Sequence, residues 1–273
     1  MNEPLAPSPV GPREGAHAKA EGVLAVEKPL DWTSHDVVAV LRGLLGLRRV
    51  GHGGTLDPLA TGVLIILAGA ATRDTERLHS SAKAYDALVR FGTETATDDR
   101  EGLMTREAPV PAVSRDALDL ALAPFRGTIE QVPPDYAAVK VGGRPAYARA
   151  RAGESQALAP RRKTIQRLAI VEWSPPELRL LVVCSSGTYI RALARDIGRA
   201  LGSAAHLGGL RRIAVGGFDL GRATPLDALR AGGRQAATER LAPLSNQDLL
   251  IDRRFLHDAP GNLVDRVSPS SGG

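Results

Sequence analysis

The stretch VGHGGTLDPLATG, residues 50–62, carries a single carboxylate on a loop that is restrained on both sides. Its glycines permit backbone angles and close approaches that residues with a Cβ resist. Pro58 fixes its own φ and pushes Asp57 towards an extended conformation. With His52 nearby, Asp57 has the features of a positioned catalytic group. The alternative is a plain turn, because aspartate is common in turns for conformational reasons alone.

The segments that flank this loop predict a buried strand and an amphipathic helix. VLIILAG, residues 63–69, is a continuous apolar run of strand length that suits burial on both faces. Upstream, valines and leucines recur at helical spacing over residues 37–45, after an N-cap at Thr33 or Ser34. Arg48 and Arg49 follow this helix, where they suit phosphate contact but also the negative end of the helix dipole.

The rest of the chain mixes hairpin-like strands with helices. The patterns predict strands at residues 22–26, 83–91, 127–132, 161–173, 177–184 and 206–220. They predict helices at residues 72–78, 114–125 and 185–202, and short ones after 224–225 and near 234–241. Regular strand–helix–strand alternation is missing, so the expected fold is α+β with a mixed, mostly antiparallel sheet.

The composition favours a polyanionic partner. Of the 273 residues, 43% are hydrophobic and 24% charged, as is ordinary for a soluble globular protein. The net charge is +5 and the pI about 9.7. Nearly all the positive charge comes from arginine, and either selection for phosphate recognition or a codon bias explains this preference. A single cysteine, Cys184, excludes an internal disulfide. No apolar run could span a bilayer and no signal peptide is visible, so a cytoplasmic location is expected.

Two further segments gather charged side chains. The acidic loop at residues 92–102 contains Asp98 and Asp99, but it lacks the glycine and terminal glutamate of a calcium loop, so no metal site is expected there. In residues 133–154, Lys140 and Arg144 are interleaved with tyrosines, as on a surface for single-stranded nucleic acid. A solvated edge with half-buried tyrosines explains this second pattern nearly as well.

The helix predicted at residues 185–202 carries arginines at every fourth position. Arg191 lies one turn inside its N-terminus, directly after a predicted central strand. That place favours a partnership with a buried carboxylate over a solvent-exposed role. Arg211 and Arg212 stand at the centre of the last strong strand.

Six segments resemble, in order and spacing, the TruB family of tRNA pseudouridine synthases. They lie between about residues 22 and 218 and read KPLDWTSHDVV, GHGGTLDPLATGVL, KAYDALVRFGTETATDDREG, FRGTIEQVPPDYAAVKVGGRPAYARAR, SSGTYIRALARDIG and LRRIAVGGF. The resemblance implies isomerisation of uridine to pseudouridine at position 55, in the T loop of tRNA. It also implies the pseudouridine synthase fold, a mixed sheet with RNA laid across a central cleft, and neither metal nor organic cofactor.

The resemblance implies roles for residues in these motifs. Asp57 matches the catalytic aspartate, Arg191 the arginine that pairs with it, and Tyr85 the tyrosine that stacks on the target base. For substrate binding, Leu210 matches an apolar residue that packs near the base. Other residues are further candidates for contact with the RNA. His52 matches a histidine that touches the T loop, Tyr189 lies beside Arg191, and weaker RNA-binding candidates are Lys28, Arg48, Arg49, Lys140, Arg144 and Arg211.

The sequence departs from the family at Gly53, where relatives have threonine, and at Ala137, where they have serine. The expected organisation is a disordered leader at residues 1–21, a catalytic domain at 22–243 and a short tail at 244–273, loose from Pro260 onwards. A full PUA-like RNA-binding domain is not expected. These departures affect the expected grip on tRNA more than the chemistry.

Other functions compete with a stand-alone synthase that acts as a monomer on the T arm of tRNA. A guide-RNA-dependent catalytic subunit shares the central motif, but it would want a PUA module and basic extensions. A tRNA-folding chaperone would need binding and not modification, and would survive Asp57→Asn. A metal-dependent phosphoryl-transfer enzyme built on Asp57, Asp98 and Asp99 is the most distant alternative, and would be sensitive to chelators.

Overall fold

The computed structural model describes residues 20–134, 136, 140–141, 144–145 and 158–264, with only the backbone described at 140–141 and 144–145. The predicted leader, residues 1–21, lies outside the described part of the chain except for its last two residues. Of these, Ala20 is buried against the core.

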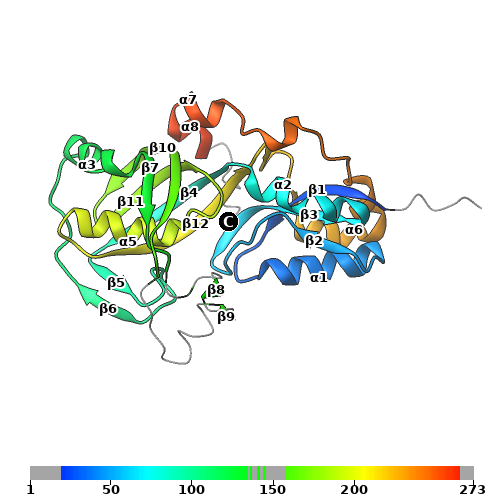
Figure 1. The fold of residues 1–273 in the computed structure, drawn as a ribbon, viewed down its shortest axis with the longest axis horizontal. Coiled ribbons are helices and arrows are strands. Elements are labelled where there is room, and N and C mark those ends of the chain that lie inside the picture. The colour runs from blue at the N-terminus through cyan, green and yellow to red at the C-terminus, as the bar shows by residue number, and fades with distance from the viewer. Residues whose placement is uncertain (1–19, 135, 137–139, 142–143, 146–157, 265–273) are drawn as a thin grey trace, which may run out of the picture.

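One large mixed sheet forms the centre of the molecule (Figure 1). Its strands lie in the order β14-β1-β3-β12-β4-β11-β10-β7, with β2 paired to β3 and β13 to β12. β3 pairs in parallel with β12, and β1 with β14, while the other described pairs are antiparallel. The predicted α+β class with a mostly antiparallel sheet is confirmed. The strands are β1 (Gly22–Lys28), β2 (Val50–His52), β3 (Ala60–Ala68), β4 (Lys83–Phe91), β7 (Gly127–Gln131), β10 (Arg161–Ser174), β11 (Glu177–Cys184), β12 (Ala205–Val215), β13 (Phe218–Asp219) and β14 (Thr224–Pro225).

Helices and short hairpins surround this sheet (Figure 1). The helices are α1 (Ser34–Leu45), α2 (Thr75–Ser80), α3 (Arg115–Ala121), α5 (Ile190–Ala200), α6 (Leu226–Glu239), α7 (Arg254–His257) and α8 (Pro260–Val264), with 3-10 turns η1 (Gly69–Asp74), η2 (Ala123–Phe125) and η3 (Gln247–Leu249). Two hairpins stand outside the main sheet: β5 (Thr93–Thr95) with β6 (Met104–Glu107), and β8 (Lys140–Val141) with β9 (Arg144–Pro145).

β3 has an apolar cluster on each of its two faces. Leu64 and Ile66 pack in the cluster formed with α1 and α6, while Ile65 and Leu67 point to the opposite cluster, which includes side chains of α2, α7 and α8. These residues are fully buried, so the burial on both faces predicted from the apolar run is confirmed. A third cluster forms where α3 and α5 pack on β4, β10, β11 and β12.

The first helix begins and ends as its sequence predicts. The Thr33 hydroxyl accepts a hydrogen bond from the Asp36 amide, and the Asp36 carboxylate accepts one from the Thr33 amide, which completes a capping box. Gly46 ends the helix in the left-handed conformation, at φ 64°, which costs a glycine little.

Three boundaries differ from the sequence-based expectations. The helix predicted from residue 185 begins only at Ile190, because Gly187 turns the preceding chain with a φ of 69°. The predicted helix at 114–125 is α3 followed by η2. The tail predicted to be loose from Pro260 is wrong for residues 260–264, since Leu263 and Val264 of α8 are buried in the core beside Phe255.

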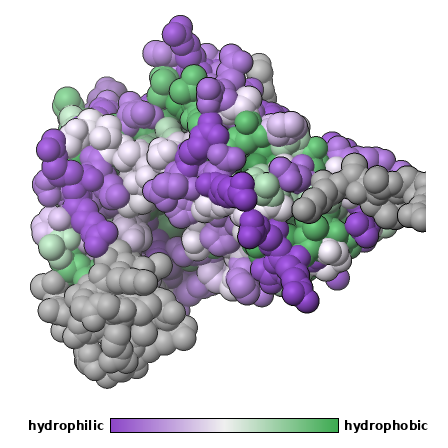
Figure 2. Space-filling view, turned by 45° about the vertical axis from the view of Figure 1, so that its right-hand side comes forward, coloured by the Kyte–Doolittle hydropathy of each residue, from purple (hydrophilic) through white to green (hydrophobic). Residues whose placement is uncertain are grey.

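Hydrophilic residues alternate with smaller apolar areas on the face shown in Figure 2. Along the described parts of the chain, no helix is both long and apolar enough to cross a membrane.

Candidate active site

The loop between β2 and β3 is held by α1 and by its own apolar side chains. Leu56 and Leu59 are buried. The Ser34 hydroxyl accepts a hydrogen bond from the Leu56 amide (2.8 Å) and donates one to the Leu56 carbonyl (3.0 Å). The Asp31 amide donates to the Pro58 carbonyl at 3.0 Å. The backbone on either side of Asp57 is therefore fixed.

Asp57 stands on this loop within reach of Arg191. The Nε atom of Arg191 lies 3.1 Å from Oδ2 of Asp57, and Nη1 lies 3.5 Å from Oδ2 of Asp99. Arg191 also donates to the Thr97 carbonyl at 3.0 Å. The Asp57 side chain is 41% exposed and that of Arg191 10%. The arrangement presents one accessible carboxylate whose orientation is set by a largely buried guanidinium.

Tyr85 and Leu210 lie beside this pair, on neighbouring strands. Both are half-buried and pack where the cluster under α5 meets the cluster under α1. Leu210 of β12 pairs with Ala60 of β3 and Ala87 of β4. Burial raises the pKa of Tyr85 to about 12, although the positive charge of Arg212 acts in the opposite direction. The Tyr85 hydroxyl therefore stays protonated at neutral pH.

Tyr189 is the N-cap residue of α5 and is anchored through its backbone. The Gln131 side-chain amide donates to the Tyr189 carbonyl at 3.0 Å, and its oxygen accepts from the Tyr189 amide at 2.9 Å. Burial raises the pKa of Tyr189, the charge of Arg191 acts to lower it and the charge of Asp57 acts to raise it. Gln131, itself buried, thus fixes the start of the helix that carries Arg191.

Arginines of α5 form ion pairs with the acidic residues at 92–102. Arg195 pairs with Asp98 at 2.7 Å, and Arg199 pairs with Glu94 at 2.7 Å. Burial raises the pKa of Asp98 to about 6, against the lowering effect of Arg195. Across the described residues, no group of three or more His, Cys, Asp or Glu side chains is arranged to hold a metal ion.

Lys28 was expected at an RNA surface, and the structure contradicts this placement. Its side chain has no exposed area, and Nζ donates to the carbonyls of Pro29 (2.8 Å), Trp32 (2.5 Å) and Pro58 (3.3 Å). Burial lowers the pKa of Lys28 to about 8. An ammonium enclosed by carbonyls cannot reach a phosphate, and it ties β1 to the Asp57 loop instead.

The other expected RNA contacts are spread over the molecule. Arg48 and Arg49 are exposed after α1, and the side chains of Lys140 and Arg144 lie outside the described residues. Arg211 is half-buried and pairs with Glu27 at 2.6 Å.

His52 lies on β2, at the start of the Asp57 loop. Its Nδ1 accepts a hydrogen bond from the Gly54 amide at 3.4 Å. Burial lowers its pKa, as do the nearby charges of His79 and Arg212. The charges that act on the ring are therefore those of basic side chains.

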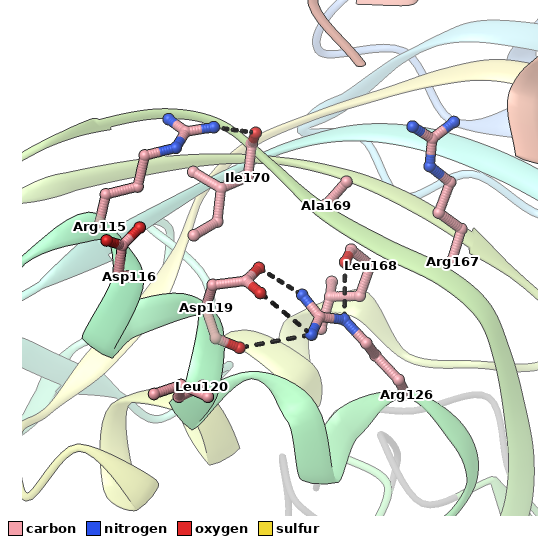
Figure 3. Close-up of a pocket in the computed structure, with 9 residues that line it drawn as sticks. All are labelled: Arg115, Asp116, Asp119, Leu120, Arg126, Arg167, Leu168, Ala169 and Ile170. Atoms are coloured by element: carbon pink, nitrogen blue, oxygen red, sulfur yellow. Dashed lines mark hydrogen bonds and ion pairs between the residues drawn. The ribbon is translucent and has the colours of Figure 1, made fainter. Parts of the chain in front are cut away.

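A separate cavity of about 600 Å³ lies between α3 and β10 (Figure 3). Its arginines are engaged within the protein: Arg126 pairs with Asp119 at 2.5 Å, and Arg115 donates to the Ile170 carbonyl at 2.7 Å. Because both of these guanidinium groups already have partners, they are not free to bind a substrate, and the site around Asp57 remains the candidate.

Comparison with known families agrees with the motifs in this site. The model for the TruB family pseudouridylate synthase N-terminal domain matches residues 42–190, and that for the tRNA pseudouridylate synthase B C-terminal domain matches residues 191–245. The chain belongs to the TruB family of tRNA pseudouridine synthases. It is therefore an isomerase that acts on uridine in tRNA.

Similar curated proteins carry the description tRNA pseudouridine synthase B. The protein of Thermobifida fusca is 46% identical over 220 residues, which cover 78% of this chain and 75% of that protein. That of Cupriavidus pinatubonensis is 45% identical over 245 residues, covering 89% of this chain and 75% of its own.

Solved structures of pseudouridine synthases share the fold. A Cbf5-Nop10-Gar1 complex contains a chain that is 28% identical, with a TM-score of 0.64 over 82% of this TruB-family chain. A second structure, of an H/ACA RNP bound to a substrate RNA that contains 2'-deoxyuridine, includes a chain that is 26% identical, with a TM-score of 0.61. This chain spans 61% and 60% of the chains it matches in them, less than two thirds of each.

Sequence reasoning missed Gln131 and Arg212 as parts of this site, and it named Asp99 only in the metal-dependent alternative. Gln131 carries no local signal, since its partner is the distant backbone of Tyr189. Arg212 could have been found from strand alternation, because it lies two residues after Leu210 and so on the same face of β12. Arg211, the neighbour selected from the sequence, points to the other face.

Proposed function

We propose that this TruB-family enzyme isomerises the uridine at position 55 in the T loop of tRNA, with Asp57 as the essential group. The observation that carries the proposal is the Asp57–Arg191 pair at 3.1 Å. It places an accessible carboxylate on a fixed loop, and Tyr85 and Leu210, which could contact a base, pack at the nearby junction of two core clusters. The curated relatives named tRNA pseudouridine synthase B support tRNA as the substrate.

The reaction moves the ribose from N1 to C5 of the same uracil. The N1–C1′ bond breaks, the base rotates, a C5–C1′ bond forms, and the proton on C5 is exchanged for one on N1. No electrons are gained or lost, so no redox partner is required. Asp57 acts on the sugar or on the base, as a nucleophile or as a base, and Arg191 keeps its carboxylate oriented throughout.

The target uridine must leave its stack before Asp57 can reach it. Base flipping costs about a few kcal/mol, and an aromatic platform recovers about 1–3 kcal/mol per stacked base. Tyr85 supplies such a platform, because its ring packs against the core and its hydroxyl stays protonated. Leu210 supports the base from the neighbouring strand.

We expect the enzyme to act on tRNA alone as a cytoplasmic monomer, without guide RNA and without metal or organic cofactor. The T arm would lie across the sheet junction near Tyr85 and Leu210. Arg48 and Arg49 are exposed at the end of α1, where they can contact phosphate. Salt would then weaken binding in proportion to the number of such contacts.

The substrate assignment is tested with T-arm hairpins that carry uridine or cytidine at the position equivalent to 55. We expect conversion of the uridine hairpin to pseudouridine, and binding without conversion of the cytidine hairpin. Pseudouridine formed at another position of full-length tRNA, with the hairpin unreacted, would contradict the assignment.

A further inference from the structure

Arg212 is a fully buried guanidinium in β12, only 1% exposed. It donates to three backbone carbonyls: from Nε to Val63 at 2.7 Å, from Nη1 to Thr55 at 3.1 Å and from Nη2 to Gly54 at 3.0 Å. None of the ion pairs formed among the described residues includes it. The side chain is therefore a buried cation held by carbonyl dipoles.

Burying a cation costs solvation free energy, which neighbouring groups must offset. Burial lowers the pKa of Arg212, whereas Tyr85 and the charge of Asp57 act to raise it. The charge of Asp57 therefore offsets part of the cost of burying Arg212, although the charge of Arg212 also lowers the pKa values of the nearby Lys28 and Lys83.

The three carbonyls lie on both sides of Asp57. Gly54 and Thr55 precede it in the loop, and Val63 follows it in β3. One planar guanidinium therefore bridges the two ends of the loop, which a flexible ammonium cannot do with the same geometry. Across the sheet, Arg212 pairs with Gly62 of β3 and Tyr85 of β4, and a Cβ on Gly62 would collide with the Arg212 carbonyl.

We infer that Arg212 is a positioning residue for the isomerisation. Its guanidinium clamps the Asp57 loop at both ends and lies against the Tyr85 hydroxyl. Its fork sets the geometry of the chemical step and leaves the affinity for tRNA unchanged. The inference rests on the proposed role of Asp57.

The test compares Arg212→Lys, which keeps the charge but loses the fork, with Arg167→Lys as a matched control. Arg167 also donates to backbone carbonyls, of Phe255 at 2.9 Å and Asp258 at 2.6 Å, but it lines the separate cavity of Figure 3. Three quantities are measured: the unfolding midpoint in urea, the Kd for tRNA by filter binding, and the single-turnover rate of tritium release from C5 at saturating enzyme.

For Arg212→Lys we expect a rate lowered about 10- to 100-fold, with a Kd within about threefold of wild type. Arg167→Lys should react at the wild-type rate whatever its stability. A wild-type rate in Arg212→Lys, or weakened binding with a normal rate at saturation, would overturn the inference. No release even from the wild type would refute the proposed function, and the inference with it.

Should Arg212→Lys not fold, hydrogen exchange decides. The Gly53 amide donates to the Ile65 carbonyl and the Leu56 amide to the Ser34 hydroxyl, so exchange is measured in Ser34→Ala as well as in the wild type. Clamping by Arg212 predicts that both amides still exchange as slowly in Ser34→Ala as those of β3. Fast exchange at these two amides would show that the loop is not clamped.

Discussion

At the scale of single residues, Arg191 is the side chain on which two carboxylates converge. We expect Arg191→Ala to lower the turnover rate about 100-fold or more, because Asp57 loses the group that orients it. The affinity for tRNA should change little, since Arg191 is largely buried. Single-turnover kinetics and filter binding check this. Weak binding combined with a normal rate at saturation would mean that Arg191 is a phosphate contact.

Lys28 makes stability depend on pH. Burial lowers its pKa from 10.5 to about 8, so between these values the unfolded chain binds its proton and the folded chain does not. The charged form therefore costs stability below pH 8, and stability rises as the pH increases from 8 towards 10.5. From pH 7 to 9 the wild type should gain about 1 kcal/mol of unfolding free energy relative to Lys28→Met. Unfolding free energies are measured in urea. A difference between wild type and Lys28→Met that is the same at pH 7 and pH 9 would contradict this prediction.

Residue-level prediction succeeded where a motif fixes both the residue type and its surroundings. The loop around Asp57 follows from the stretch GHGGTLDP, and the pairing of Arg191 with Asp57, which the resemblance to the family implied, is present at 3.1 Å. It failed for Lys28, because its burial depends on carbonyls of Trp32 and Pro58 that only the folded chain brings together. The roles of the site residues remain predictions.

At the scale of elements, α5 and the acidic loop form one electrostatic unit. Burial alone would raise the pKa of Glu94, but hydrogen bonds from Arg199 and Arg106 outweigh it and hold the pKa below 4.5. This pairing therefore contributes stability above pH 4.5, which is lost as the pH falls further. Breaking it with Glu94→Gln should cost about 1–2 kcal/mol at pH 7.

The Glu94→Gln experiment needs urea unfolding at pH 7 and near pH 3.5, with Glu107→Gln on the exposed side of β6 as the control. The difference between Glu94→Gln and wild type should shrink at the lower pH. A difference that stays constant with pH, or an equal loss in Glu107→Gln, would show that the Glu94 charge is not the cause.

The elements themselves were largely predictable, but their ends were not. The strand at residues 83–91 was found with its bounds, because alternation and flanking residues both mark it. The helix of Arg191 was predicted five residues too early, since Gly187 permits a turn that periodicity cannot show. Packing of α8 on the far face escaped prediction because five residues carry too little pattern.

At the scale of the whole molecule, the site lies where two halves of one sheet meet. The pairing of β3 with β12 is parallel and joins segments about 150 residues apart in sequence. It places the Asp57 loop, Tyr85 and Leu210 at the junction of two core clusters. The sequence predicted a mixed sheet but not its strand order, because long-range pairing leaves no local pattern.

The most direct test of the account is tritium release from tRNA labelled at uridine C5, with wild type and Asp57→Asn side by side in the presence of a chelator. The account predicts release by the wild type alone, while Asp57→Asn still binds tRNA. Equal release by both proteins would contradict an essential role for Asp57. Binding by both without any release would favour a tRNA-folding role over modification of this substrate.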